Sequence, residues 1–323
     1  MALNVKRINE IQLTPDPLLT ELAQRYENAD FISTFLLPTT MVRKDTGKIP
    51  VYGNENMRIH DSKRALRAPV KEMPIDNFSF KEFKLDNYGL EATMDYKEIE
   101  ATSDFLDLEN YSINTVMQSI LLAREYDAVK LVTDSNTYSS SHHIGLTSGD
   151  YFNDSASDPL AIIRDGMETV RAKINKKPNV IVLSQSTFNA LQAHPKITDL
   201  IKHTQIGVVT EDLIATILST SDNKVTVKVG TGVYEDPATG TNVDLWGDVV
   251  VMAYNKQFSR VNSIYDVSFG KSLVQNGYPV ATRSQDRNGI LHYAAVLHSY
   301  KNYITQKDAG FLITDTIGEV SGG

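Results

Sequence analysis

The stretch DLENYSINTVMQSILLAREYDAVKLVTD (residues 107–134) carries the strongest structural signal in the chain. Its apolar residues recur at intervals of three and four positions, which is the spacing of an amphipathic helix. Asp104, Asp107 and Glu109 put negative charge at the start of this helix, where the helix dipole is positive. At 1.5 Å per residue the helix would be about 40 Å long, longer than most helices of globular proteins. The sequence therefore predicts one very long helix.

Two segments of opposite charge precede this helix. Residues 41–71 contain eight Lys or Arg and three Asp or Glu, a balance of +5, whereas residues 72–109 contain three bases and eleven acids, a balance of −8. The basic segment has few apolar residues and turn signals at Gly47 and Gly53, which indicates a long two-stranded excursion. An isolated hairpin is marginal in water. We therefore expect this excursion to lie on a partner molecule.

The first forty residues are typical of an extended arm. Leu18, Leu22 and Tyr26 fall on one helical face, and the apolar run that contains Phe31 and Phe35 follows them. This stripe has too few apolar neighbours in its own segment to form a core. We therefore expect these five residues to dock the arm on another surface.

A compact α/β unit and a β-rich tail follow the long helix. Asp158 before Pro159 is the signature of a helix start, and residues 179–184 and 246–254 are typical of buried strands between covering helices. After residue 265 the pattern favours strands at 278–283, 290–305 and 310–317. The middle strand also carries a weak helical pattern.

The sequence offers no site for catalysis, a metal or a cofactor. The chain has no Cys, and its seven His residues lack metal-ligand spacing. Gly270-Lys271-Ser272 resembles a phosphate loop, but Tyr265 replaces the first glycine. Ser184 lacks the flanking glycines of a hydrolase nucleophile, which favours a helix N-cap. We therefore expect no catalytic residue, metal or cofactor, and the chain is not expected to be an enzyme.

Charge and hydropathy exclude further classes of function. The chain has 32 Lys or Arg and 40 Asp or Glu residues, a net charge of −8, which does not suit a generic nucleic-acid binder. No stretch approaches the ~18 consecutive apolar residues that span a membrane, so we expect no membrane partner.

Three stretches in this order resemble the major capsid proteins of tailed bacteriophages, which have the Hong Kong 97-like fold. They are Phe31 to Tyr52 with Arg67-Ala68-Pro69, Lys177 to Ser184 with His194-Pro195, and Val229 to Tyr234 with Trp246-Gly247. The resemblance covers nearly the whole chain and implies an α+β fold. It implies an N-terminal arm (1–40), an E-loop hairpin (41–77), a P-domain (78–157) with a spine helix at 107–134, an α/β A-domain (158–264) and closing P-domain strands (265–323).

This resemblance implies a structural function. The chain is expected to self-assemble through hexamers and pentamers into an icosahedral head around double-stranded DNA, in the virion, after assembly in the host bacterial cytoplasm. The implied partners are other copies of the chain, scaffold and portal proteins, a decoration protein, and DNA held by weak non-specific contact. Some members of the family begin with a long helical scaffolding region that a protease removes, and the arm is reached here within about forty residues of Met1, which leaves no room for that region. The resemblance therefore implies either a separate scaffold protein or cleavage upstream of this sequence. The alternatives are an encapsulin-like compartment and, more remotely, an α/β hydrolytic enzyme.

The charge pattern suggests how neighbouring copies meet. We expect the E-loop of one copy to lie over an acidic belt on the next, because opposite potentials set register and speed encounter. Apolar contacts of Phe31–Leu37 and of the spine helix would supply most of the holding energy. The E-loop residues are Arg43, Lys44, Lys48, Arg58, Lys63, Arg64 and Arg67, and the acidic belt is Asp95, Glu98, Glu100, Asp104, Asp107 and Glu109.

Overall fold

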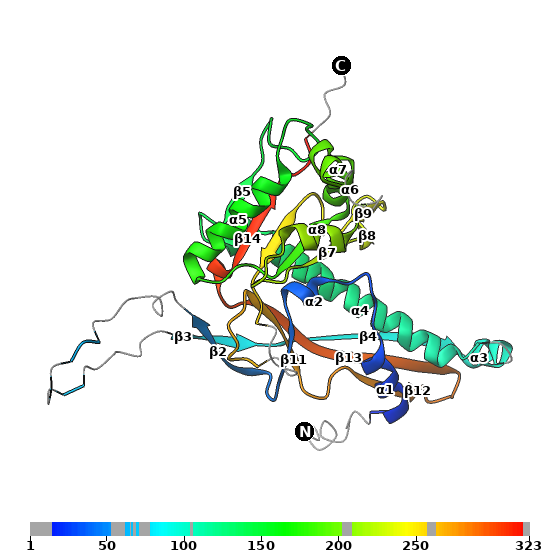
Figure 1. Ribbon diagram of the computed structural model, residues 1–323. Helices are drawn as coiled ribbons and strands as arrows, with labels where there is room; N and C mark the ends of the chain where they lie inside the picture. Colours follow the sequence, from blue (N-terminus) through cyan, green and yellow to red (C-terminus); the bar gives the residue numbers. More distant parts are fainter. Residues whose placement is uncertain are drawn as a thin grey trace.

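The computed structural model describes residues 15–52, 62–64, 66, 69–70, 78–103, 106–201, 209–256 and 263–318. They form two units, each built on a β-sheet, and one long helix runs between them (Figure 1). No helix in these ranges is both long enough and apolar enough to cross a membrane.

The first unit is a long five-stranded sheet. Its central strand, β13, pairs with β4 along one edge, antiparallel from Leu291 opposite Asp95 to Tyr300 opposite Asp86. On its other edge it pairs first with β12 and then with β11, which in turn pairs with β1. The strands are β1 (Thr39–Val42), β4 (Asp86–Asp95), β11 (Gly270–Gln275), β12 (Val280–Gln285) and β13 (Leu291–Ile304).

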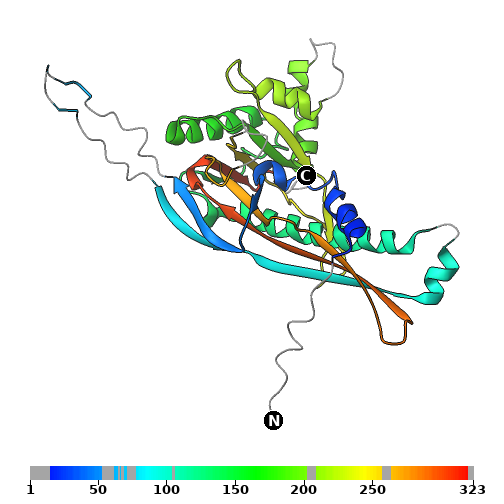
Figure 2. The same ribbon diagram turned by 90° about the horizontal axis from the view of Figure 1, so that it is seen from below.

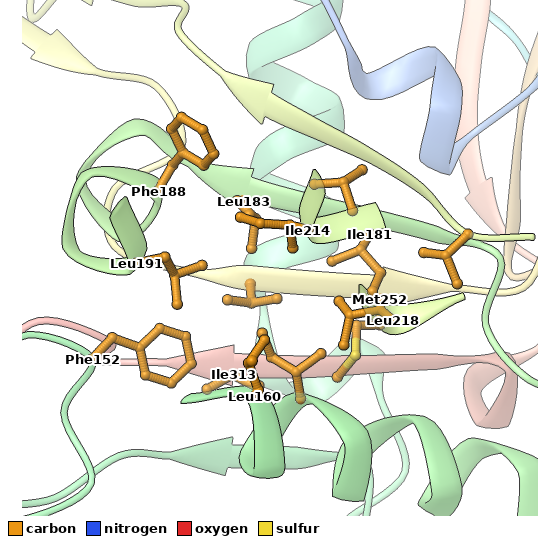
Figure 3. Close-up of a cluster of buried hydrophobic side chains, with 14 of the residues drawn as sticks. Phe152, Leu160, Ile181, Leu183, Phe188, Leu191, Ile214, Leu218, Met252 and Ile313 are labelled. Atoms are coloured by element: carbon orange, nitrogen blue, oxygen red, sulfur yellow. The ribbon is translucent and has the colours of Figure 1, made fainter. Parts of the chain in front are cut away.

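The second unit has a five-stranded sheet with apolar side chains on both faces, in the order β5-β14-β10-β6-β7. Ile181 and Leu183 face the covering helices (Figure 3), whereas Val180 and Val182 face a second apolar cluster on the opposite side. The strands are β5 (His143–Gly145), β6 (Val180–Ser184), β7 (Thr226–Gly230), β10 (Val250–Ala253) and β14 (Gly310–Thr314). The helices are α5 (Pro159–Ile174), α6 (Gln185–Ala193), α7 (Pro195–Ile201) and α8 (Glu211–Leu218).

The long helix α4 (Leu108–Thr133) confirms the spine helix predicted at 107–134. Its first half packs Ile113 and Met117 against the sheet of the first unit. Its second half packs Val129 and Val132 into the apolar cluster beneath the second sheet. The length follows from this double role, because each unit buries one half of the same helix.

Short elements complete the chain. The hairpin base is β2 (Thr46–Tyr52), antiparallel to β3 (Phe78–Lys84). The helices α1 (Pro17–Arg25), α2 (Ser33–Leu36) and α3 (Tyr96–Thr102) belong to the arm and to the far end of the first sheet. The others are η3 (Ser135–Thr137), β8 (Val233–Glu235), β9 (Asn242–Asp244) and η4 (Lys307–Ala309).

Three expected boundaries differ from the structure. β14, expected among the closing strands, pairs with β10 and β5 in the second sheet, because Phe311, Leu312 and Ile313 are apolar on both faces and suit a strand covered on both sides. β5 also joins that sheet, although it lies in the range expected for the P-domain. The hairpin base extends past residue 77 to Lys84.

Candidate assembly surfaces

The arm helix α1 docks on β12 and α4. Asp16 caps the helix, and its backbone N–H donates to the Ala281 carbonyl at 3.0 Å. The Thr20 hydroxyl donates to the same carbonyl at 3.2 Å and accepts from the Ala281 N–H at 3.1 Å. These bonds extend the strand pairing of β12 to the arm.

The apolar face of α1 differs by one position from the predicted stripe. Leu19 and Ala23 are buried, and Leu22 and Tyr26 pack beside them, in agreement with two of the three expected residues. Leu18 is 79% exposed, so within the chain it takes no part in docking. Either of the adjacent leucines at 18 and 19 could lie on the apolar face of the helix. The contact with β12 places Leu19 on the buried face.

The elbow after α1 is held by a buried carboxylate on the spine helix. Glu125 is 2% exposed, and it accepts backbone N–H groups from Ile32 at 3.0 Å and from Ser33 at 3.0 and 3.1 Å. Burial raises the pKa of Glu125, and the hydrogen bonds from Ser33 and Ile32 and the nearby Arg124 oppose this shift. The arm is therefore anchored to α4 by a polar contact inside the protein.

The apolar run after this elbow is largely used inside its own chain. Ile32, Leu36 and Leu37 are buried in the cluster beneath the second sheet. Phe35 is the most exposed aromatic residue of this run, at 40%, and the Lys228 ammonium lies 5.6 Å from its ring centre. Most of the apolar surface that was expected to hold neighbouring subunits together is thus buried in the core of its own subunit. Phe31 and Phe35 are the residues of this run that stay partly exposed.

A polar cluster next to Glu125 ties α4 to the central strand β13. Arg124 donates to the hydroxyls of Thr39 at 2.8 Å and Ser272 at 2.9 Å, and lies 5.7 Å from the ring centre of Tyr300. Tyr300 stacks on Tyr88 at 4.3 Å. The neighbouring His298 is 3% exposed, and burial, with Arg124 nearby, lowers its pKa to about 4.

Most of the acidic belt has local structural roles. Asp95 and Glu98 form the capping box of α3, Asp107 caps α4 by accepting from the Asn110 N–H at 3.1 Å, and Glu109 pairs with Arg283 at 3.0 Å. Glu100 is exposed, and within the described ranges its carboxylate has no hydrogen bond or ion pair. Asp104 lies outside the described residues.

The belt borders a small cleft of about 430 Å³ between α1 and the start of α4. Four carboxylates line the cleft, and two guanidinium groups partly offset them through ion pairs. The lining includes Asp16, Glu21, Asp107, Glu109, Arg25 and Arg283, with Leu18 beside them. The cleft thus combines negative charge with one exposed leucine.

The described E-loop residues are all exposed. Arg43, Lys44 and Lys48 lie near the hairpin base, where Lys48 is opposite Glu82 in the strand register, and Lys63 and Arg64 lie farther out. Leu66 and Val70 on the same loop are 91% and 80% exposed. Arg58 and Arg67 lie outside the described residues.

The two charged surfaces lie at opposite ends of the subunit. Figures 1 and 2 both show the open end of the β2–β3 hairpin at one end of the long sheet and α3 at the other. Within one copy, the described residues of the E-loop are therefore separated by the length of the sheet from the part of the acidic belt on α3. Any contact between them joins two copies, and it uses different faces of each, which is the heterologous geometry that closes rings.

The residues considered for chemistry have structural roles. The Ser184 hydroxyl caps α6 and lies 2.7 Å from the Thr187 hydroxyl, and Gly270-Lys271-Ser272 is the start of strand β11. In the described ranges, no three His, Asp or Glu side chains gather in a way that could hold a metal ion.

Sequence reasoning missed the Arg124–Glu125 pair as a structural centre. The signal was present, because two adjacent charged residues interrupt the apolar pattern of the long helix. Their partners lie more than eighty positions away in the chain, at Thr39 and Ser33. Local spacing does not reveal such partners.

Comparisons with known proteins agree on one family. Residues 116–268 match the family described as "Phage major capsid protein E". The chain is 33% identical over 315 residues to the major capsid protein of Burkholderia phage BcepMu, which covers 97% of this chain and 99% of that protein.

Solved structures extend the agreement to the fold. A phage-related protein from Bordetella bronchiseptica superposes with a TM-score of 0.80 at 25% identity, over 94% of this chain and 98% of that one. The SrpI encapsulin of Synechococcus elongatus matches with a TM-score of 0.53 at 11% identity, over 98% and 97% of the two chains. The likeness to the encapsulin reflects the shared fold alone, and the fold is Hong Kong 97-like.

Proposed function

Because this chain belongs to the family of phage major capsid proteins, we propose that its copies assemble through hexamers and pentamers into an icosahedral head that encloses double-stranded DNA. The observation that carries the proposal is the separation of the basic E-loop and the acidic belt to opposite ends of one extended subunit. In such a subunit, the basic and the acidic surface can pair with opposite charge only on further copies that are arranged head to tail.

The contact that we propose places the E-loop of one copy over the acidic belt and cleft of the next. Lys63 and Arg64 would face the carboxylates of Glu21 and Glu100, while Leu66 would cover the exposed Leu18. Each exposed ion pair contributes at most about 1 kcal/mol, so the charges set register and encounter rate. Buried apolar area, at about 25 cal/mol per Å², supplies most of the holding energy.

The role is structural rather than catalytic. This part of the proposal is supported by the hydroxyl of Ser184, which caps α6, and by the glycine-lysine-serine stretch, which lies in the buried start of strand β11. The virion is the location that the family implies. Assembly in the bacterial cytoplasm, with separate scaffold and portal proteins, a decoration protein and packaged DNA as partners, belongs to the same proposal.

A charge-reversal series tests the contact between copies. The parent chain and the variant Lys63→Glu/Arg64→Glu are purified and imaged by electron microscopy, with circular dichroism to confirm folding. We expect shells from the parent chain and folded but unassembled protein from the variant. Adding Glu21→Lys/Glu100→Lys to the variant should restore shells, because the attraction returns with its sign exchanged on both sides.

The matched control is Lys130→Glu/Lys196→Glu, which reverses two exposed lysines on other surfaces and should assemble like the parent. Normal shells from the Lys63→Glu/Arg64→Glu variant would disprove the electrostatic contact. Failure of the parent chain to form shells under any assembly condition, with or without its phage partners, would count against the capsid function itself.

A further inference from the structure

A polar groove in the second unit has no role in the contacts described so far. It has a volume of about 750 Å³ and lies where the end of α5, the start of β6, the turn before β7 and the end of β10 meet. Its lining contains three lysines, Lys176, Lys177 and Lys224, that form no ion pair within the described part of the chain. The groove is therefore a local concentration of positive charge in a chain of net charge −8.

The walls of the groove are fixed by hydrogen bonds. Asn179 donates to the Asn255 carbonyl at 2.7 Å, and its side-chain oxygen accepts from the Asn255 N–H at 2.9 Å. Asn223 donates to the Pro178 carbonyl at 2.8 Å, which ties the turn before β7 to the start of β6. The lysines therefore project from a backbone that is held in place before any partner arrives.

The chemistry of the lining identifies the partner. Next to the lysines, the groove offers hydroxyl and amide groups such as Thr220, Ser221 and Asn175, together with one carboxylate, Asp222, and one aromatic ring, Tyr254, and it has no aliphatic side chain. Protein interfaces generally have a cluster of aromatic and aliphatic side chains at the centre of the contact, and one half-buried tyrosine does not supply such a cluster. Lysines beside neutral hydrogen-bond donors are the usual contacts of nucleic-acid phosphates.

We propose that this groove is where the subunit touches packaged DNA, through phosphates and without reading sequence. The inference rests on the proposed capsid function and gives it a specific contact surface. Three lysines release about three counterions on binding, which corresponds to a salt slope of about −2.7 in log K against log salt concentration. Such a contact is weak in one subunit and is repeated over every subunit of a shell.

The test uses the full-length, unassembled chain and a fluorescent 30-bp duplex of arbitrary sequence, with fluorescence anisotropy measured from 25 to 200 mM salt. The variant Lys176→Ala/Lys177→Ala/Lys224→Ala should lose at least tenfold in affinity at the lowest salt and flatten the salt slope by about 2.7. Lys97→Ala/Lys130→Ala/Lys196→Ala removes the same charge from other exposed surfaces and should bind like the parent.

The proposal fails if the groove variant binds the duplex as the parent does, or if the control variant loses as much affinity. It also fails if polyglutamate binds the parent more tightly than DNA does, since the groove would then suit an acidic protein. Electron microscopy of the groove variant separates this inference from the capsid function: shells of normal shape with unchanged DNA affinity would overturn the groove and leave the capsid function intact.

Discussion

The carboxylate of Glu125 accepts the backbone N–H of Ser33 at 3.0 Å, although 92 positions separate the two residues. This contact and the one to Ile32 fasten the N-terminal arm to the spine helix at a point that water does not reach. Burying a carboxylate costs free energy unless its oxygens are hydrogen-bonded. The N–H groups of the arm therefore stabilise the buried Glu125 carboxylate of the spine helix, and the same bonds hold the arm in place.

Replacing Glu125 should therefore destabilise the subunit. Glu125→Ala leaves two buried N–H groups without an acceptor, and we expect the free energy of unfolding to fall by about 3 kcal/mol. Glu125→Gln keeps one acceptor oxygen and should lose less. Urea unfolding of the unassembled chain measures both effects, and Glu100→Ala, at an exposed position on α3, should change stability by less than about 0.5 kcal/mol. Equal stabilities for Glu125→Ala and the parent would contradict this role.

Acid should destabilise the subunit through His298. Its pKa is lowered from about 6.5 to about 4 by burial and by Arg124, so between these pH values the unfolded chain binds the proton more readily. Stability should therefore fall as pH drops from 6.5 to 4, by at most about 3–4 kcal/mol from this residue. Urea unfolding at several pH values should show a flatter profile for His298→Gln than for the parent. A profile with unchanged slope would exclude His298 as the cause, and His292→Gln serves as the control on the same strand.

Substitutions at the two adjacent leucines of α1 should have different effects, one on folding stability and the other on assembly. Leu19→Ala removes a buried side chain and should lower the stability of the unassembled chain by about 2–4 kcal/mol. Leu18→Ala removes an exposed side chain, so stability should stay the same while shells form more slowly or not at all. Thermal unfolding and light scattering measure the two effects. If Leu18→Ala assembles at the parent rate, the exposed leucine has no part in the contact between copies.

Gly230 should tolerate no side chain. A Cβ at this position would lie 2.3 Å from Cδ1 of the buried Trp246, and the indole has no room to move because it is 2% exposed. We expect Gly230→Ala to destabilise the chain by about 1–3 kcal/mol through overpacking. Gly232→Ala is the matched control, since its Cβ would meet Leu245 at an ordinary 3.6 Å. The thermal midpoints of the two variants should differ, and equal midpoints would show that the Trp246 site can rearrange.

Elements with strong local periodicity could be predicted from the sequence. The spine helix, the helix starting at Pro159 and the strand at 180–184 each carry their own signal in spacing, capping and apolar content. The middle strand of the tail was ambiguous by periodicity, and pairing along both of its edges decides in favour of a strand. Local pattern thus fixed the type of most elements.

Partners distant in the chain could not be predicted from the sequence. Helical spacing fits an apolar face through Leu18 as well as one through Leu19. Only the contact of α1 with β12 shows that Leu19 is the buried one. The apolar strand at 310–314 fits either sheet by composition, and its place beside β10 follows from the two-sided burial that only the second sheet provides. The acidic belt was identified by charge, but its use in capping α3 and α4 depends on side-chain geometry.

The long antiparallel pairing of β4 with β13 has a mechanical consequence. Ten residue pairs, from Asp86 opposite Tyr300 to Asp95 opposite Leu291, run along the length of the subunit. Their hydrogen bonds lie perpendicular to the strands, so a pull along the strands strains all of them at once instead of opening them one by one. If the proposed shell places these strands in the plane of its wall, the pairing would resist tension in that plane by shear.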